Sequence, residues 1–327
     1  MPIPPLIVAT AKKGWHWQWN QLMNGLAPSD IDGNYLRPIS QKLNAIAPSA
    51  KDLLHRPNES SLKLIIGRSC PWAHRTWLVY KIRKIDNKLD IFLARPNLEK
   101  GLWDLEPSLL GCKSLIDLYR LCQTPPSHRA TVPALIDPGI EANQKPRLLG
   151  NESAQLVEVL NSWPTQEESQ NLAPVHLQNE IHEWSKIFQL FVNDGVYRCG
   201  FARNQKAYEK ASNNLFNVLE KLEKHLSQYG PWICGETLTL ADIRLFPTLI
   251  RWEIVYEPLF ICSGKALWIF PNICKWRKRF FEMSNIAETC DSRGWRQDYF
   301  GALFPLRPSN IIPKGLDIKE IVKGPQN

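Results

Sequence analysis

The chain has 327 residues, of which 44% are hydrophobic and 22% charged, with 40 basic and 32 acidic side chains. These proportions are those of a well-packed globular protein and exclude a disordered or low-complexity chain. No segment holds the run of about 18 uncharged apolar residues that crosses a bilayer. The first residues also lack the basic and apolar regions of a signal peptide. We therefore expect a cytoplasmic protein of about two domains, without membrane insertion.

The net charge of +8 raises the question of a nucleic-acid partner. Nucleic-acid binding gathers basic residues on one element. The densest basic groups, Lys81–Lys84 and Lys275–Arg279, are short and mixed with apolar residues. Solvated helix faces explain them better, and a positive field suits a small anionic ligand equally well. We expect no nucleic-acid partner.

Residues 1–60 are predicted to form an extended N-terminal arm. They are rich in Pro, Asn and Ser and show little hydrophobic periodicity. Trp15, Trp17 and Trp19 alternate with other residues, as in an extended segment that lies over a groove.

Strands and helices are predicted to alternate in residues 61–161. The expected strands are 61–67, 89–94, 131–136 and 147–149, the expected helices are 72–84 and 151–161, and 95–128 is a less regular insert. The order β-α-β followed by β-β-α is that of a thioredoxin-like α/β domain.

The remaining residues are predicted to form a linker and an all-helical C-terminal domain. Residues 162–176 are polar and contain proline, which is typical of a linker. In residues 177–327 the signal is helical, because apolar side chains recur every three or four positions from Gln205 to Leu226. Thr239 and Asp242 have the spacing of a capping box at a helix start.

One of the eight cysteines, Cys70, stands apart from the others. No two cysteines have Cys-x-x-Cys spacing and no histidine completes a zinc quartet, so we expect no metal. Cys70 lies between a strand end and a helix start, with Pro71 in the first turn. The free N–H groups and the helix dipole favour a thiolate there, which predicts a pKa well below the usual value of about 8.5. The alternative is a structural cysteine that only happens to precede proline.

The residue at the resolving-cysteine position is Ala73. A lone reactive thiol at Cys70 therefore cannot close its own disulfide there. It must form a mixed disulfide and be released by an external thiol, which in most cytosols is glutathione.

Two further segments fit a peptide-like ligand such as glutathione. Val132-Pro133 at the start of a strand predicts a cis peptide bond. The Val132 backbone would then be free to pair with the ligand backbone. Ser153 at a helix N-terminus suits a carboxylate, and Glu152 beside it suits an ammonium group. Taken alone, these two residues are explained equally well by helix capping.

Residues 70–75, Cys-Pro-Trp-Ala-His-Arg, resemble the signature hexapeptide of the Xi-class glutathione transferases, the glutathionyl-hydroquinone reductases. The resemblance continues in Gly33-x-Tyr35-x-Arg37-x-x-Ser40, Arg129-x-Thr131-Val132-Pro133, Asn151-Glu152-Ser153-Ala154, Gly195-Val196-Tyr197-Arg198-x-Gly200-Phe201-Ala202, Leu238-Thr239-Leu240-Ala241-Asp242, Arg244-Leu245-Phe246, Val255-Tyr256 and Asn310-Ile311-Ile312-Pro313. It implies the glutathione transferase fold, in which an N-terminal thioredoxin-like α/β domain precedes an all-α C-terminal domain. It also implies a homodimer, formed largely through the C-terminal domain.

The resemblance implies reduction of glutathionyl-hydroquinones by thiol exchange. Cys70 attacks the glutathione sulfur and expels the hydroquinone, and a second glutathione releases oxidised glutathione. Tyr197 matches the tyrosine that protonates the leaving carbon, and Tyr256 and Tyr299 match tyrosines that stabilise the thiolate. The implied glutathione contacts are Trp103, Arg129, Ala130, Thr131, Val132, Glu152 and Ser153.

One segment departs from the family pattern. Where the family has His-Tyr-Tyr-x-Ser-His, this chain has Asp298-Tyr299-Phe300-Gly301-Ala302-Leu303, so the acceptor half is more apolar. The natural quinone therefore stays open. One alternative is a glutathione-dependent thioltransferase or dehydroascorbate reductase with another substrate range. A second alternative is a non-catalytic binding module of the same fold, against which the presence of Cys70 argues.

Overall fold

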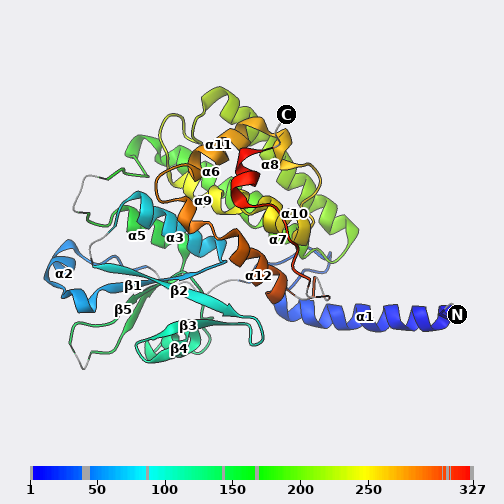
Figure 1. Ribbon diagram of the computed structural model, residues 1–327, viewed down its shortest axis with the longest axis horizontal. Helices are drawn as coiled ribbons and strands as arrows, with labels where there is room; N and C mark the ends of the chain where they lie inside the picture. Colours follow the sequence, from blue (N-terminus) through cyan, green and yellow to red (C-terminus); the bar gives the residue numbers. More distant parts are fainter. Residues whose placement is uncertain are drawn as a thin grey trace.

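The computed structural model combines a mixed sheet with a larger helical body (Figure 1). It describes residues 3–38, 45–85, 88–141, 144–165, 169–303, 305–306, 309 and 311–324. Ser40 and Asn310, which belong to the motifs above, lie outside the described residues, as does part of the predicted linker. None of the described helices is long and apolar enough to cross a bilayer.

The sheet has a thioredoxin-like centre with a hairpin added at one edge. Its strands are β1 (Leu62–Gly67), β2 (Leu89–Asn97), β3 (Leu102–Leu109), β4 (Cys112–Ser114), β5 (Ala134–Asp137) and β6 (Arg147–Gly150). Their spatial order is β4-β3-β2-β1-β5-β6. β1 and β2 are parallel, with Ile65 opposite Phe92, and β5 is antiparallel to β1. Because the apolar side chains of β1 are buried on both faces, this strand anchors the elements that follow it.

The helices form the second layer and the helical body. They are α1 (Pro5–Leu26), α2 (Ala50–His55), α3 (Pro71–Ile82), α4 (Leu115–Leu121), α5 (Ser153–Asn161), α6 (Gln178–Phe188), α7 (Gly195–Gly200), α8 (Gln205–Tyr229), α9 (Leu240–Leu249), α10 (Glu257–Phe260), α11 (Pro271–Phe281), α12 (Ser292–Ala302) and α13 (Ile318–Lys323). Short 3₁₀ turns are η1 (Asn58–Ser60), η2 (Val175–Leu177), η5 (Leu267–Ile269) and η6 (Ala287–Thr289), and η3 (Gln189–Asn193) and η4 (Trp252–Tyr256) are π-helical. The predicted α/β and all-α fold class is confirmed; the domain boundaries stay predictions.

A buried carboxylate ties the start of α9 to its surroundings. Asp242 accepts hydrogen bonds from the backbone N–H of Thr239 at 2.9 Å and of Ile233 at 3.0 Å. It also accepts the indole N–H of Trp276, on α11, at 2.8 Å. The predicted helix start is therefore confirmed, and its capping carboxylate also holds two other segments in place.

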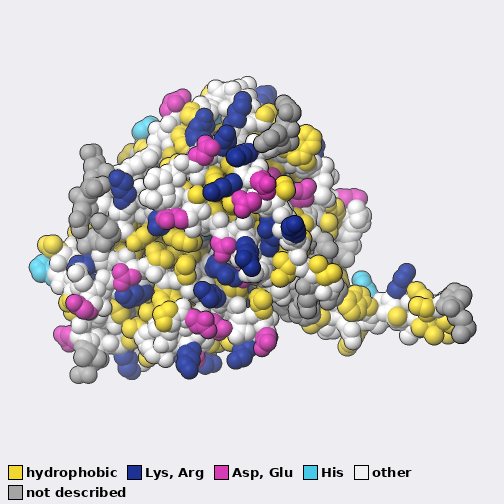
Figure 2. All heavy atoms as spheres, viewed as in Figure 1, with side chains coloured by type: hydrophobic (Ala, Val, Ile, Leu, Met, Phe, Trp, Pro, Cys, Tyr) yellow, Lys and Arg dark blue, Asp and Glu magenta, His cyan; other side chains and the backbone are white. Residues whose placement is uncertain are grey.

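The prediction of an extended arm is wrong for the first part of the chain, where residues 5–26 form the helix α1. Its prolines lie at the helix start, where they do no harm, and good helix formers follow. On a helix, alternate residues point to nearly opposite sides. Trp15 and Trp17 therefore lie on nearly opposite sides of the helix. Because the helix projects from the body, both are exposed, at 57% and 64%. The helix projects from the body and carries exposed apolar side chains (Figures 1 and 2).

The insert predicted for residues 95–128 is also regular structure. It contains the end of β2, the strands β3 and β4, and α4. The hydrophobic pattern failed because β3 lies near the sheet edge, and Leu105 is its one fully buried side chain.

Candidate active site

Cys70 occupies the junction between β1 and α3, as predicted. Its N–H donates to the carbonyl of Gly67 at 3.0 Å, which closes a turn at the end of the strand. It is the N-cap residue of α3, with Pro71 in the first turn, and its carbonyl accepts the N–H of His74 at 3.0 Å. The buried strand and the helix start thus fix the thiol in place.

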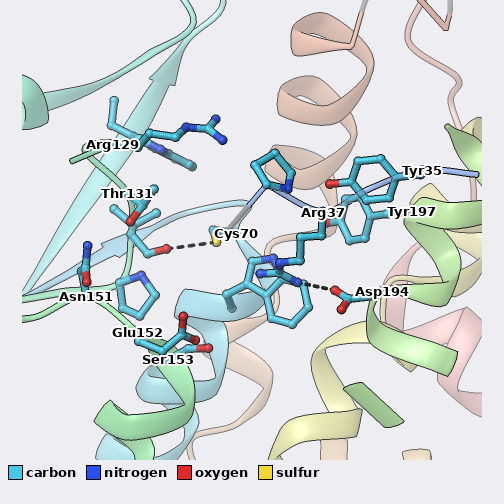
Figure 3. Close-up of a pocket in the computed structure, with 15 residues that line it drawn as sticks. Tyr35, Arg37, Cys70, Arg129, Thr131, Asn151, Glu152, Ser153, Asp194 and Tyr197 are labelled. Carbon is cyan, nitrogen blue, oxygen red and sulfur yellow. Dashed lines mark hydrogen bonds and ion pairs between the residues drawn. The ribbon is translucent and has the colours of Figure 1, made fainter. Parts of the chain in front are cut away.

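The predicted direction of the Cys70 pKa is wrong. Burial raises the pKa of the Cys70 thiol above its usual value. The N–H groups of Ala73 and Trp72 and the charges of Arg251 and Arg37 oppose this rise. The thiol lies 3.6 Å from the carbonyl oxygen of Val132, to which it can donate (Figure 3). Sequence reasoning counted the helix N-terminus but had no measure of the burial.

A polar cavity of about 260 Å³ opens on one side of Cys70. Its walls are Tyr35, Arg37, Pro38, Cys70, Trp72, Trp103, Arg129, Thr131, Val132, Pro133, Asn151, Glu152, Ser153, Asp194 and Tyr197. The Val132–Pro133 bond is cis, as predicted. All the predicted glutathione contacts except Ala130 lie in this wall; Ala130 packs against the core instead.

The elements around the polar cavity hold its backbone groups in place. The hydroxyl of Tyr119, on α4, donates to the carbonyl of Thr131 at 2.7 Å and so fixes the segment before the cis bond. Glu152 is the N-cap of α5, where its side chain accepts the N–H of Ala154 at 3.4 Å, and Ser153 is the first residue of the helix. Both residues line the cavity, so the N-terminal end of α5 lies at its wall. A helix N-terminus of this kind suits a carboxylate. The residues present therefore fit the γ-glutamyl end of glutathione.

A second, mostly apolar cavity of about 230 Å³ opens on the other side of Cys70. Its walls are Ser69, Cys70, Pro71, Trp72, Pro96, Trp103, Tyr197, Phe201, Asp298, Tyr299, Ala302 and Leu303. The two cavities share Cys70, Trp72, Trp103 and Tyr197. A ligand that spans both cavities would pass the thiol.

Close packing against a glycine places Trp103 at the boundary of the two cavities. A Cβ atom on Gly67 would lie 2.6 Å from both the Trp103 ring and the Val132 side chain. Only glycine at the end of β1 lets the indole from β3 and the segment before the cis bond converge there.

Three tyrosine hydroxyls form a chain beside the apolar cavity. The Tyr197 and Tyr299 hydroxyl oxygens are 2.9 Å apart, and those of Tyr256 and Tyr299 are 3.4 Å apart. Burial raises the pKa of all three phenols above the ordinary value. They are therefore neutral near pH 7 and able to donate protons. No hydrogen bond joins a hydroxyl of these three described residues to the sulfur of Cys70.

The described residues contain no group of three or more His, Cys, Asp or Glu side chains that could hold a metal ion. All eight cysteines are free thiols.

Comparison with known proteins places the chain in a family. The family model for the glutathione S-transferase C-terminal domain matches residues 205–280. The chain is 30% identical over 262 residues to glutathionyl-hydroquinone reductase YqjG of Escherichia coli, covering 77% of this chain and 78% of that protein. This chain belongs to the glutathionyl-hydroquinone reductase family.

Solved structures agree with this assignment to the Xi-class glutathione transferases. A glutathione-bound structure of YqjG from Escherichia coli is 31% identical, with a TM-score of 0.72 over 79% of this chain and 86% of that chain. The glutathione S-transferase Xi from Phanerochaete chrysosporium is 27% identical, with a TM-score of 0.77 over 88% of this chain and 94% of that chain. The chain is an enzyme of the glutathione transferase class.

The departure from the Xi-class pattern lies in the wall of the apolar cavity. Asp298 is buried and forms an ion pair with Arg68, which precedes the active-site turn. The indole N–H of Trp295 donates to the Arg68 carbonyl at 3.2 Å. Leu303 lines the apolar cavity, whereas Phe300 is buried and lies outside its wall. The segment thus holds α12 against the turn before Cys70.

The N-terminal arm supplies cavity residues that the predicted site omitted. Arg37 forms an ion pair with Asp194 (Figure 3). Its guanidinium also lies over the Trp72 ring, 3.9 Å from the ring centre. Tyr35 lines the same cavity. The signal for both was the Gly33-x-Tyr35-x-Arg37 motif, which carried the family resemblance but no assigned role.

Proposed function

We propose that this enzyme reduces glutathionyl-hydroquinones to hydroquinones with glutathione as the reductant. The observation that carries the proposal is the position of Cys70 between two cavities of different chemistry. The polar cavity suits the glutathionyl part, and the apolar cavity, with Trp72, Trp103 and Phe201 in its wall, suits a flat aromatic ring.

The polar cavity would hold the glutathionyl group by its backbone and its ends. The N–H and carbonyl of Val132 would pair with the ligand backbone as an added strand does. The N-terminus of α5, with Ser153, would hold the γ-glutamyl carboxylate. Arg129 and Trp103 line the same cavity and are further proposed contacts. Binding at Val132 would also compete for the carbonyl that faces the Cys70 thiol.

The first step forms one S–S bond and breaks one C–S bond. The Cys70 thiolate attacks the glutathione sulfur, and the bond from that sulfur to the ring carbon breaks. Tyr197 gives its proton to that carbon, so the hydroquinone leaves in reduced form. The enzyme is left with a Cys70–glutathione disulfide and a tyrosine anion, to which we also assign contributions from Tyr256 and Tyr299.

The second step restores the enzyme. The thiol proton of a second glutathione returns to the tyrosine anion, and its sulfur attacks the glutathione sulfur of the mixed disulfide. Oxidised glutathione leaves and the Cys70 thiolate is regenerated. The hydroquinone has gained one hydrogen, and two glutathione sulfurs have become one disulfide.

The cavity chemistry separates this proposal from the alternatives. Dehydroascorbate is small and polar and would gain little from an apolar cavity, whereas an aromatic ring would bury its faces there. A non-catalytic module gives no reason for a thiol where two cavities meet. Steady-state turnover of a glutathionyl-hydroquinone, dehydroascorbate and a mixed disulfide decides between them. If the enzyme turns over dehydroascorbate or the mixed disulfide but not the glutathionyl-hydroquinone, the proposal is refuted.

We also propose a homodimer, formed largely through the C-terminal helical domain. Trp252 and Phe260 are buried inside the core and offer nothing to an interface. Trp268 is 60% exposed and, with Ile261 and Ile269, still offers apolar surface. The exposed apolar side chains of α1 are a second uncovered surface.

A further inference from the structure

A buried arginine without a carboxylate partner lies behind the active site. Arg251, in the turn between α9 and η4, has 0% of its surface exposed. One Nη donates to the carbonyl of Pro247 and to Nδ1 of His74, each at 2.9 Å. The guanidinium lies over the Trp295 ring, 3.7 Å from its centre. Nε and the other Nη have no hydrogen-bond partner.

A second buried arginine gives a comparison within the same protein. Arg277 is equally enclosed, but it forms an ion pair with Glu253 at 2.7 Å. No ion pair among the described residues includes Arg251. An isolated buried charge is costly unless an opposite charge compensates it. Such a cation in an enzyme core is therefore a candidate partner for an anion that forms during the reaction.

Arg251 is directly linked to the helix that carries Cys70. Nδ1 of His74 accepts from Arg251, so the ring proton is on Nε2, which donates to the hydroxyl of Thr289 at 2.8 Å. The Thr289 hydroxyl in turn donates to Ile286. Burial and the charge of Arg251 lower the pKa of His74 well below its usual value, so this histidine is neutral. The N–H of His74 donates to the carbonyl of Cys70, one turn away.

Arg251 is also linked to the tyrosine chain. Its carbonyl accepts the N–H of Val255 at 2.8 Å and of Tyr256 at 3.4 Å, which sets the wide first turn of η4. The hydroxyl of Tyr256 then reaches Tyr299, and Tyr299 reaches Tyr197. Burial raises the pKa of Cys70, Tyr256 and Tyr299, and the charge of Arg251 opposes this rise in each of them.

We propose that Arg251 is the fixed counter-charge of the reaction, which stabilises first the Cys70 thiolate and then the tyrosine anion left when Tyr197 gives up its proton. The second half of this role rests on the function proposed above. Arg251 does not touch the cavities and acts through Cys70 and the tyrosines, so it is a positioning residue.

This arrangement keeps the net charge of the site constant through the first step. Before attack the negative charge is on Cys70, and after attack it is on the tyrosine chain. The charge of the same buried cation acts on Cys70 and, in the tyrosine chain, on Tyr256 and Tyr299, so the negative charge moves without a new counter-ion. Preorganised charges of this kind stabilise a transition state because nothing has to reorient.

Two other cations near Cys70 already have carboxylate partners, so they are not free to act as its counter-charge. Arg37 is neutralised by Asp194, and Arg68 is neutralised by Asp298.

The remaining groups that face Cys70 are neutral or of opposite sign to one another. His74 and the three chain tyrosines are neutral near pH 7. Arg129 and Glu152 stand in the outer wall of the polar cavity and carry opposite charges. Arg75, on α3, is also buried without an ion pair among the described residues, and its guanidinium lies over the Trp72 ring, 4.4 Å from its centre. The cations that most lower the pKa of Cys70 are Arg251 and Arg37, and of these two Arg251 is the one without a carboxylate partner.

The test measures the rate of Cys70 alkylation by iodoacetamide from pH 5 to pH 10 in the full-length enzyme. Trypsin cleavage after Arg68 and Arg75 gives a peptide that contains Cys70 alone, so mass spectrometry separates it from the other thiols. We expect Arg251→Met to raise the pKa of Cys70 and to slow its alkylation at pH 7 about tenfold, since one pKa unit is a tenfold change in thiolate. Arg251→Lys retains the charge and should stay within about threefold of the parent enzyme.

Two further variants protect the test against a folding failure. Arg277→Lys is the matched control at a buried arginine outside the walls of both cavities, and it should leave alkylation of Cys70 unchanged. Cys290→Asp adds a carboxylate close to Arg251, whose charge already acts on the thiol of Cys290. It should also raise the pKa of Cys70, with Arg251 still present.

The outcomes separate this inference from the proposed function. If Arg251→Met or Cys290→Asp folds and Cys70 titrates as in the parent enzyme, the counter-charge role is refuted. Equal pKa shifts in the Met and Lys variants would refute it too, because charge would not be the cause. The alkylation needs no quinone, so its result stands whatever the substrate. With glutathionyl-hydroquinone, Arg251→Met should remain about tenfold slow even at a pH where Cys70 is fully ionised.

Discussion

The hydroxyl oxygens of Tyr197 and Tyr299 lie 2.9 Å apart although the two residues are 102 positions apart in the chain. Tyr197 comes from α7 and Tyr299 from α12, and both line the apolar cavity. Either hydroxyl can donate in this hydrogen bond. Once Tyr197 has given up its proton, a hydrogen bond donated by Tyr299 would stabilise the anion that remains. The pair therefore joins the expected acid to a group that supports it.

Replacing Tyr197 with Phe should slow hydroquinone release about 10²-fold, the usual contribution of a general acid. Alkylation of Cys70 should hardly change, because no hydrogen bond links the Tyr197 hydroxyl to the thiol. Rapid-quench analysis of released hydroquinone measures the first quantity and iodoacetamide kinetics the second. Tyr229→Phe, at a tyrosine that is 60% exposed and outside both cavities, is the matched control and should change neither rate. An equal loss of both rates in Tyr197→Phe would contradict the role of acid.

The tyrosine chain should make the fold sensitive to alkali. Burial raises the pKa of Tyr299 well above the ordinary value of 10.0, and neighbouring Tyr256 adds to the rise. A raised pKa contributes stability that is fully present below pH 10 and is lost as pH rises towards the folded-state value. Each such group can remove about 1.4 kcal/mol of unfolding free energy per pH unit there. Thermal melts from pH 8 to pH 11 should fall less steeply for Tyr299→Phe.

The matched control for the alkaline melts is Tyr229→Phe, at a tyrosine that is 60% exposed. This variant should follow the parent curve at every pH. If Tyr299→Phe and Tyr229→Phe show the same dependence of melting temperature on pH, ionisation of the buried tyrosine chain does not cause the loss of stability in alkali.

The contact between the N-terminal arm and Trp72 should matter for glutathione binding. Arg37→Met removes the ion pair to Asp194 and the cation over the Trp72 ring, so the wall of the polar cavity loses its support. We expect KM for glutathione to rise about tenfold, with a smaller change in kcat. Arg120→Met, at a surface ion pair where the Arg120 side chain is 72% exposed, is the control and should change neither constant. An unchanged KM for glutathione in Arg37→Met would show that the N-terminal arm does not contribute to glutathione binding.

The parts of the site predicted from sequence are those set by local pattern. Cys70 before Pro71 and Ser153 at a helix start depend on neighbouring residues, and the structure places them as expected. The pairing of Arg37 with Asp194 and the isolation of Arg251 depend on residues that meet only in the fold. The sequence alone does not show which distant residues meet in the fold.

Two predictions are wrong for different reasons. Alternating tryptophans in residues 15–19 favoured an extended arm, but helix formers on both sides made a helix. The prediction of a low pKa for Cys70 depends on the helix start and on tyrosine donors, whereas the burial that raises the pKa is a property of the packed fold.

Light scattering at low micromolar concentration should give the mass of a dimer. Trp268→Glu places a charge on the exposed apolar surface of the C-terminal domain and should shift the mass towards that of a monomer. Trp17→Glu changes an equally exposed tryptophan on α1 and should leave the mass unchanged. A monomer mass for the parent protein would contradict the dimer, and an effect of Trp17→Glu alone would move the interface to α1.

The central claim is that Cys70 takes the glutathionyl group from the substrate. Intact-protein mass spectrometry after one turnover with a glutathionyl-hydroquinone, without free glutathione, tests it directly. We predict one added glutathionyl group, located on the peptide with Cys70, and one equivalent of released hydroquinone. Cys70→Ser should fold normally and show neither. Hydroquinone release without the mixed disulfide, or release by Cys70→Ser, would contradict the account.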